Sequence, residues 1–347
     1  MEKLVCLIVA RNLGDAVIQS AFLRKLVASG YSERYIAWVR PQIAFLFRDI
    51  PNCEIATSQF PVGTAKNFGL KNAWLFLKES LRIRRLRPSV TLDLVGDFRE
   101  RAFARLTGAP KRLQIGWANG HPHRVIIRNP FGDGNPVFVV PKTCPNVYLS
   151  YGMFLSYLTG GKETSILSTV RNSGAGQLKI GLHPFASQEC KLWPAENWLA
   201  LAQQLLTDGH ELTMFGAGGE KAMLEQMFAP LLSRVTIFTR SLADFTSAVA
   251  NLDLFIGLDS FGVHMSQRQG VQGIMINAGN DPTVWTPPGA RVLAHSGGCQ
   301  YYPCSNVPKC QGSSTEYVCV RSIKTEEVLA AIGPADLAVV NTVTAGL

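Results

Sequence analysis

The sequence lacks several features that would place the chain in other protein classes. No apolar run approaches the ~20 residues of a membrane-spanning helix. The apolar residues 4–10 are interrupted by Arg11 and Asp15, and no convincing cleavage site follows, so we interpret them as a first β-strand rather than a signal peptide. No basic segment interleaved with aromatic residues marks a nucleic-acid-binding module. We therefore expect a cytoplasmic protein without a nucleic-acid partner.

Charged residues are also few. They make up 17% of the 347 residues, against 47% hydrophobic residues, a composition typical of a well-packed globular protein that is long enough for two domains. The net charge is nevertheless +9, and part of the excess lies in Arg82, Arg84 and Arg85, with more between residues 99 and 112. These arginines form either a solvated helix face or a basic surface for an anionic lipid or an acidic acceptor. Peripheral contact with the inner face of a membrane is one interpretation.

The eight cysteines include no Cys-x-x-Cys pair, the spacing typical of zinc ribbons. Without a signal peptide, a disulfide framework is not expected. The last four cysteines lie close together in the sequence, at Cys299, Cys304, Cys310 and Cys319. We expect reduced thiols, or an occasional disulfide in a structured loop, and no bound metal. Four thiolates that hold zinc or iron are the alternative.

Strand-like and helix-like segments alternate along the whole chain. Strands are expected at residues 4–10, 35–40, 91–95, 112–117, 178–183, 211–215, 235–238, 254–258 and 273–276. Helices are expected at residues 16–29, 67–87, 99–107, 146–158, 194–208, 242–250 and 263–269. Such β-α alternation predicts parallel sheets.

A polar, glycine-rich stretch at residues 160–177 interrupts the alternation and predicts a domain boundary. We expect an N-terminal domain at residues 1–165, a C-terminal domain at 175–330 and a tail at 331–347. The fold class is α/β, with two Rossmann-like domains that face a central cleft. Ligands then bind outside the carboxyl ends of the strands.

Gly14 and Asp15 follow the first expected strand. Gly14 permits a tight turn, which would leave Asp15 at the carboxyl end of that strand. Asp15 is then either a general base that projects into the cleft or an N-cap of the next helix. The segment is not a Gly-x-Gly-x-x-Gly fingerprint, which disfavours ordinary NAD binding in this half. We assign Arg11 and Gly14 to the acceptor side of the site.

Two polar segments of the second half also follow expected strands. Lys191 can neutralise a phosphate at the mouth of a cleft, or it is an ordinary surface lysine. Glu220 follows the glycine-rich turn 216–219. Its carboxylate can accept hydrogen bonds from a ribose diol, or it complements a helix dipole from the first turn.

The segment from Asp259 through Ser260 to His264 separates an apolar strand from a helix. A helix N-terminus binds anions, because its first N–H groups lack partners and the helix dipole is positive there. His264 lies four residues after Ser260, so both side chains can face the same ligand. A structural histidine is the alternative. The segment predicts a phosphate-bearing ligand.

Together these segments resemble glycosyltransferase family 9, the heptosyltransferases of lipopolysaccharide core synthesis and their relatives. The resemblance covers nearly the whole chain and rests on Gly14-Asp15, Lys191-x-Trp193-Pro194, Gly218-Gly219-Glu220, Asp259-Ser260 with His264, and the four late cysteines. It implies a GT-B fold and an inverting reaction without a catalytic metal. It also implies an ADP-activated donor sugar on the C-terminal domain and an acceptor on the N-terminal domain.

The resemblance also implies a role for each matching residue. Asp15 would deprotonate the acceptor hydroxyl. Lys191 and the backbone after Asp259 would hold the diphosphate, with His264 in support, and Glu220 would bind the ribose. The expected reaction moves heptose from ADP-heptose to a lipopolysaccharide core or a related surface glycan, and no cofactor is expected beside the donor.

One departure from the family concerns the turn after Asp259-Ser260. Relatives commonly have glycine directly after this pair, whereas this chain has Phe261 there and Gly262 one position later. The bulky ring can reshape the donor pocket. Two other functions therefore stay open: a GT-B transferase or epimerase that uses another nucleotide sugar, and a non-catalytic nucleotide-sugar-binding protein.

Overall fold

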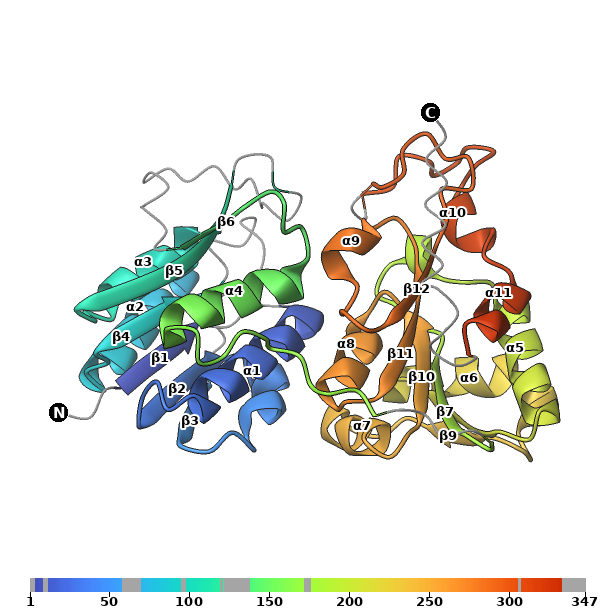
Figure 1. Cartoon of the computed structure of the whole chain (residues 1–347), viewed down its shortest axis with the longest axis horizontal. Helices are drawn as coiled ribbons and strands as arrows, with labels where there is room; N and C mark the ends of the chain where they lie inside the picture. The colour runs from blue at the N-terminus through green and yellow to red at the C-terminus, as the bar shows by residue number, and fades with distance from the viewer. Residues whose placement is uncertain are drawn as a thin grey trace. The chain divides into compact units, whose positions relative to one another are not determined.

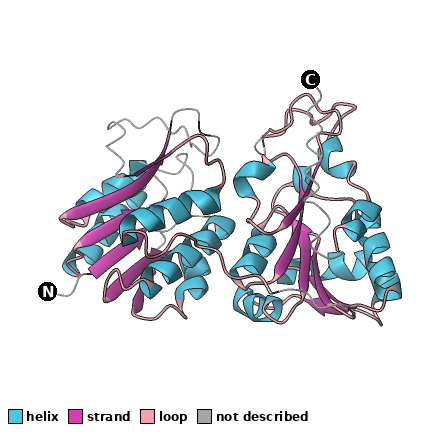
Figure 2. Ribbon diagram, in the orientation of Figure 1, coloured by secondary structure: helices cyan, strands magenta, loops and turns pink. Residues whose placement is uncertain are grey.

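The computed structural model describes residues 4–8, 12–57, 70–94, 98–118, 121, 138–171, 176–304 and 307–332. The chain divides into two compact units, Met1–Ile166 and Leu167–Leu347. Each unit is built on a parallel sheet with helices on both faces (Figure 1; Figure 2). Two parallel-sheet α/β domains were predicted, and this part of the fold class is confirmed. The relative placement of the two domains stays a prediction.

The first sheet has the strand order β3-β2-β1-β4-β5-β6. Its strands are β1 (Leu4–Ile8), β2 (Arg34–Val39), β3 (Cys53–Thr57), β4 (Val90–Asp93), β5 (Lys111–Trp117) and β6 (Phe138–Val140). Its helices are α1 (Leu13–Ala28), η1 (Pro41–Phe47), α2 (Leu70–Arg85), α3 (Phe98–Leu106) and α4 (Val147–Thr159). Helices α1 and α4 pack together on one face, and α2 and α3 on the other (Figure 1).

The second sheet has the strand order β12-β11-β10-β7-β8-β9. Its strands are β7 (Lys179–His183), β8 (Glu211–Phe215), β9 (Thr236–Phe238), β10 (Leu254–Leu258), β11 (Gln272–Asn277) and β12 (Arg291–Ala294). Its helices are η3 (Glu189–Lys191), α5 (Ala195–Thr207), η4 (Gly218–Glu220), α6 (Lys221–Met227), η5 (Ala229–Leu231), α7 (Leu242–Val249), α8 (Phe261–Arg268), α9 (Pro282–Trp285), α10 (Val318–Arg321) and α11 (Thr325–Ala330).

Both sheets have the same topology. The first strand of each unit pairs with the fourth, β1 with β4 and β7 with β10, and the remaining strands extend outward on either side. This order, 3-2-1-4-5-6, is that of dinucleotide-binding sheets, whose ligands bind where the order reverses. The residues that follow β1, β7 and β10 therefore lie at the two switch points.

Three strands were not predicted from the sequence: β3, β6 and β12. The first helix also differs from the prediction, because it begins at Leu13 rather than near residue 16. Gly14 consequently lies inside the first turn of α1 and does not form a separate tight turn. Among the described residues, no helix is long and apolar enough to cross a membrane.

Candidate functional site

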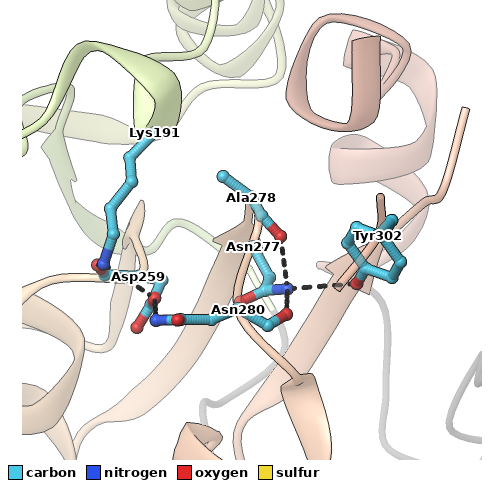
Figure 3. Close-up of polar contacts among 6 residues, drawn as sticks. All are labelled: Lys191, Asp259, Asn277, Ala278, Asn280 and Tyr302. Carbon is cyan, nitrogen blue, oxygen red and sulfur yellow. Dashed lines mark hydrogen bonds and ion pairs between the residues drawn. The ribbon is translucent and has the colours of Figure 1, made fainter. Parts of the chain in front are cut away.

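Lys191 and Asp259 form a buried ion pair at the switch point of the second sheet (Figure 3). Lys191 ends η3, and Asp259 directly follows β10. The Lys191 Nζ donates to the main-chain oxygen and to Oδ2 of Asp259, at 3.0 Å each. The two side chains are only 13% and 5% exposed. The interpretation of Lys191 as an ordinary surface lysine is therefore wrong.

The Lys-x-Trp-Pro segment explains how η3 is held in place. Trp193 is buried and its indole Nε1 donates to the Ile323 carbonyl oxygen at 2.8 Å. Its ring packs edge-on against Trp198 of α5, with centroids 5.1 Å apart. Pro194 then occupies the N-cap position of α5. The loop that carries Lys191 is thus anchored by buried contacts directly after the lysine.

Asn280 is a member of the site that sequence reasoning missed. Its Nδ2 donates to the same Oδ2 of Asp259 that Lys191 contacts (Figure 3). Asn280 is buried, and it lies after β11, the strand that pairs with β10. The available signal was its position: it follows an expected apolar strand, as Asp259 does.

Asn277 and Tyr302 hold the turn that carries Asn280. The Asn277 Nδ2 lies within hydrogen-bonding distance of the Ala278 oxygen (2.9 Å), the Asn280 oxygen (2.8 Å) and the Tyr302 hydroxyl (3.3 Å). Burial raises the pKa of Tyr302 to about 12, so the hydroxyl stays neutral. The Cys304 N–H donates to the Gly279 oxygen at 2.8 Å and fixes the following loop to the same turn.

Buried polar atoms without a hydrogen-bond partner surround the N-terminus of α8. Ser260 is the N-cap residue, yet its side chain makes no capping bond, and its Oγ is among these atoms within the described residues. The His183 Nδ1, at the end of β7, is another. Buried polar atoms are normally satisfied, and here they adjoin the first turn of a helix. The arrangement fits an anionic ligand that these groups would bind.

His264 lies in the same helix and is buried. Burial lowers the pKa values of His183 and His264 to about 4, and Asp259 and Lys191 act on His264 in opposite directions. Both rings are therefore neutral at pH 7. His264 lies close enough to the ion pair for both charges to act on it, but it carries no positive charge in the ligand-free protein.

Packing around α8 explains why this chain has Phe261 directly after Ser260 and glycine one position later. The ring of Phe261 packs against Phe245 of α7, with centroids 5.3 Å apart. A Cβ on Gly262 would lie 2.7 Å from the Cζ of Phe255, closer than real carbon contacts. Gly262 thus lets α8 approach β10, while Phe261 extends an aromatic cluster beside α8.

Glu220 has a structural partner. Its Oε2 accepts a hydrogen bond from the Ala217 N–H at 2.6 Å and caps the short helix η4. This contact agrees with the alternative interpretation, in which Glu220 serves the first turn of a helix. The ribose-binding role stays a prediction.

In the N-terminal unit, Asp15 occupies the first turn of α1. Asn12 is the N-cap residue, so Asp15 is not, and the Asn12 Nδ2 donates to the Asp15 Oδ2 at 3.0 Å. Burial raises the pKa of Asp15 to about 6, against the lowering effect of Asn12. Gly14 lies beside it in the same turn. Arg11, which was assigned to the acceptor side, lies outside the described residues.

Tyr151 and Gln19 accompany Asp15 and were not predicted. The Gln19 Nε2 donates to the Tyr151 hydroxyl at 3.2 Å, and this hydroxyl donates to the Leu94 oxygen at 2.8 Å. Burial raises the pKa of Tyr151, and Asp15 and Asp93 raise it further. The two carboxylates after β1 and at the end of β4 thus act on one buried phenol. Gln19, one helical turn after Asp15, was the available signal.

All eight cysteines are described, and all are free thiols. Burial raises the pKa of Cys319 to about 11, and the thiols of Cys299, Cys304 and Cys310 raise it further, which places the late cysteines near one another. Among the described residues, no group of three or more His, Cys, Asp or Glu side chains is arranged to hold a metal ion. Elemental analysis of the purified protein tests the metal alternative.

Part of the chain matches a known family. Residues 161–313 match the model of glycosyltransferase family 9 (heptosyltransferase), a range that contains Lys191, Asp259 and Asn280. A comparison with curated protein sequences finds no match.

Solved structures share the fold along nearly their whole length. A glycosyl transferase family 9 protein from Veillonella parvula is 16% identical, with a TM-score of 0.69, and the match covers 95% of this chain and 96% of that one. ADP-heptose lps heptosyltransferase II of E. coli is 16% identical, with a TM-score of 0.67, and the match covers 96% of this chain and 97% of that one. E. coli heptosyltransferase WaaC with ADP is 13% identical, with a TM-score of 0.68, and the match covers 95% of this chain and 98% of that one.

At these identities the structural likeness concerns the fold, whereas the family model matches the sequence of the second unit. The family match is the finding that points to a glycosyltransferase. The comparisons agree with the resemblance drawn from the sequence: residues 161–313 match the model of glycosyltransferase family 9, and the chain has the two-sheet, GT-B-like fold of the solved family 9 and heptosyltransferase structures.

Proposed function

We propose that this chain is an inverting glycosyltransferase that moves a sugar, with heptose from ADP-heptose as the first candidate, onto a glycolipid or glycan acceptor. The observation that carries the proposal is the buried Lys191–Asp259 pair beside the N-terminus of α8, where the Ser260 Oγ has no hydrogen-bond partner among the described residues. A cation, helix N–H groups and an unsatisfied hydroxyl together suit a diphosphate.

The diphosphate is the leaving group of such a reaction. Negative charge grows on it as the bond to the anomeric carbon breaks, and groups that stabilise this charge lower the barrier. An ammonium has three donor hydrogens. Lys191 directs two of its contacts at Asp259, which leaves a donor for a phosphate oxygen. ADP is the nucleotide that we propose, since solved structures of the same fold are described with ADP and with ADP-2-deoxy-2-fluoro heptose.

Asp15 is the proposed general base. A sugar hydroxyl is a weak nucleophile, and a positioned base accelerates its attack by typically ~10²–10⁴-fold. A pKa of about 6 leaves Asp15 mostly ionised at pH 7, yet more basic than an ordinary aspartate.

We propose that transfer needs no metal ion or cofactor, so activity should persist in EDTA. Eight free thiols suit the reducing cytoplasm.

Calorimetry with ADP, UDP, GDP and their sugar conjugates tests the donor assignment. We expect selective binding of ADP and ADP-heptose by the wild type and by Lys221→Ala, whose lysine is exposed on α6, and weaker binding of both by Lys191→Ala. Selective UDP binding would discard heptose transfer, and formation of a 2-epimer from UDP-N-acetylglucosamine would identify an epimerase. Binding without turnover on any acceptor would support a non-catalytic protein.

A further inference from the structure

Helix α2 has two faces of different character. One face packs into the N-terminal unit: Ser80 and Ile83 are fully buried, and Phe76 packs edge-on against Phe103 at 6.2 Å. Another face exposes four large apolar side chains, Leu70 (93% exposed), Trp74 (60%), Leu77 (47%) and Leu81 (44%). We call these four the apolar stripe. It lies outside the site described above and is not explained by it.

The apolar stripe is continuous along the helix. Its members are spaced four, three and four residues apart, so at about 100° per residue they fall within roughly 60° of the helix circumference. At 1.5 Å per residue the stripe is about 16 Å long. Single exposed apolar residues are common on protein surfaces, whereas a contiguous patch marks an interaction site.

The charge around the stripe is strongly positive. Residues 70–87 contain six basic residues and one acidic residue, Glu79. Glu79 is paired with Arg82, which also donates to the Thr57 oxygen, so both are turned away from the stripe. By helical position, Lys78 and Arg85 lie along one side of the stripe, and Arg84 lies along the other. The Lys78 ammonium lies 5.1 Å from the centre of the Trp74 ring.

We propose that this face of α2 binds the surface of an anionic phospholipid bilayer, with the helix parallel to the membrane plane. The apolar stripe would enter the boundary between headgroups and acyl chains, and Lys78, Arg84 and Arg85 would contact lipid phosphates. Basic residues beside a stripe of Trp and Leu are the pattern of interfacial helices. A second copy docked on the same face would bring like charges together, which disfavours self-association.

The proposal concerns the N-terminal unit and does not depend on the donor site. It is tested by flotation of the purified full-length chain with vesicles of phosphatidylcholine alone, and of phosphatidylcholine with 30% phosphatidylglycerol. We expect binding to the anionic vesicles only, weakened at 500 mM salt because surface charges are then screened.

Two variants separate the contributions. Leu77→Asp/Leu81→Asp removes half of the stripe, and Lys78→Glu/Arg85→Glu reverses two charges beside it. Each should weaken binding to anionic vesicles by roughly tenfold or more. The matched control, Met223→Asp/Lys221→Glu, changes an exposed methionine and lysine on α6 and should bind as the wild type does. Because all of these side chains are exposed, ADP affinity and Tm should stay unchanged and report folding.

Equal binding of neutral and anionic vesicles, or wild-type binding by both α2 variants, would overturn the proposal. So would a wild type that binds neither vesicle. A stripe variant that changes only the oligomeric state in sedimentation would assign the face to a second copy instead. Loss of ADP binding in the wild type bears on the proposed function and leaves the vesicle result intact.

Discussion

Lys191 and Asp259 lie 68 positions apart, yet the ammonium of the first donates to both the main-chain oxygen and the carboxylate of the second. The bond to the main chain fixes the ammonium at the end of β10, where α8 begins. The bond to the carboxylate cancels a buried negative charge that would otherwise repel an anionic ligand. Removal of one partner of such a pair leaves the charge of the other uncompensated in the protein interior.

Replacement of Lys191 by alanine should weaken ADP much more than AMP, because the β-phosphate is the group expected to meet the ammonium. We expect a loss of ADP affinity of about 10–100-fold, measured by calorimetry, with AMP binding changed less than about threefold. Retained AMP binding also shows that the C-terminal unit is folded. An unchanged ratio of ADP to AMP affinity would place the diphosphate elsewhere.

Replacement of Asn280 should also lower the ratio of ADP affinity to AMP affinity, through its contact with Asp259. In Asn280→Leu, the carboxylate loses one of its donors, so Lys191 is held less firmly, and we expect ADP affinity to fall by about 3–10-fold. Asn280→Asp should lower ADP affinity further, because a second carboxylate beside Asp259 opposes anion binding. Asn251→Leu, at an exposed asparagine of the same unit, is the control. Equal loss of ADP and AMP affinity would indicate a merely structural role for Asn280.

Asp15→Asn should lower kcat by about 10²–10⁴-fold while leaving ADP affinity unchanged. In the wild type, kcat/KM should fall as the pH drops through about 6, the pKa of Asp15. Because the folded-state pKa is raised above the ordinary value of 3.8, folding favours the protonated acid. The variant should therefore be more stable than the wild type above pH 6, by about 3 kcal/mol, and equally stable below pH 4. Wild-type turnover by Asp15→Asn would remove Asp15 as the base.

ADP binding should take up a proton on His264. Burial holds the pKa of this ring at about 4, and a diphosphate beside it would favour the charged form. At pH 5.5 the binding enthalpy should then depend on the ionisation enthalpy of the buffer. The quantity to measure is the proton uptake of the wild type minus that of His264→Gln, since the nucleotide itself titrates nearby. Identical uptake in both proteins would show that His264 stays neutral.

Gly262→Ala should destabilise the protein, because the added Cβ would lie 2.7 Å from the Phe255 ring. Overpacking of this kind typically costs about 1–3 kcal/mol. Gly219→Ala is a matched control, since a Cβ there meets nothing within 4 Å. Guanidinium unfolding compares the two. A Gly262→Ala protein as stable as the control would show that α8 shifts without cost.

A continuous apolar run made a strand easiest to locate from the sequence. Strand β10 matches its expected bounds because all five of its residues are buried. Strand β3 escaped prediction because four of its five residues are not fully buried, so no apolar run marks it. Edge and short strands are specified by their neighbours more than by their own sequence.

The candidate site was predictable where a polar residue stands in the segment that follows an expected strand. Lys191, Asp259 and Asp15 were found in this way. Asn280 was not, because its contact with Asp259 depends on β10 and β11 being neighbours in the sheet, which a strand list does not reveal. The capping contact of Glu220 and the ring contact of Phe261 depend on side-chain direction, which spacing alone does not determine.

The shared strand order of the two sheets has a consequence for how such chains diversify. Each unit carries its own switch point, and the polypeptide passes between the units once, near Ile166 and Leu167. A single recombination at that junction would exchange one half of the molecule without disturbing the hydrogen-bonded strands of the other. If the units bind donor and acceptor as proposed, new pairings of the two substrates can arise by joining halves inherited from different parents.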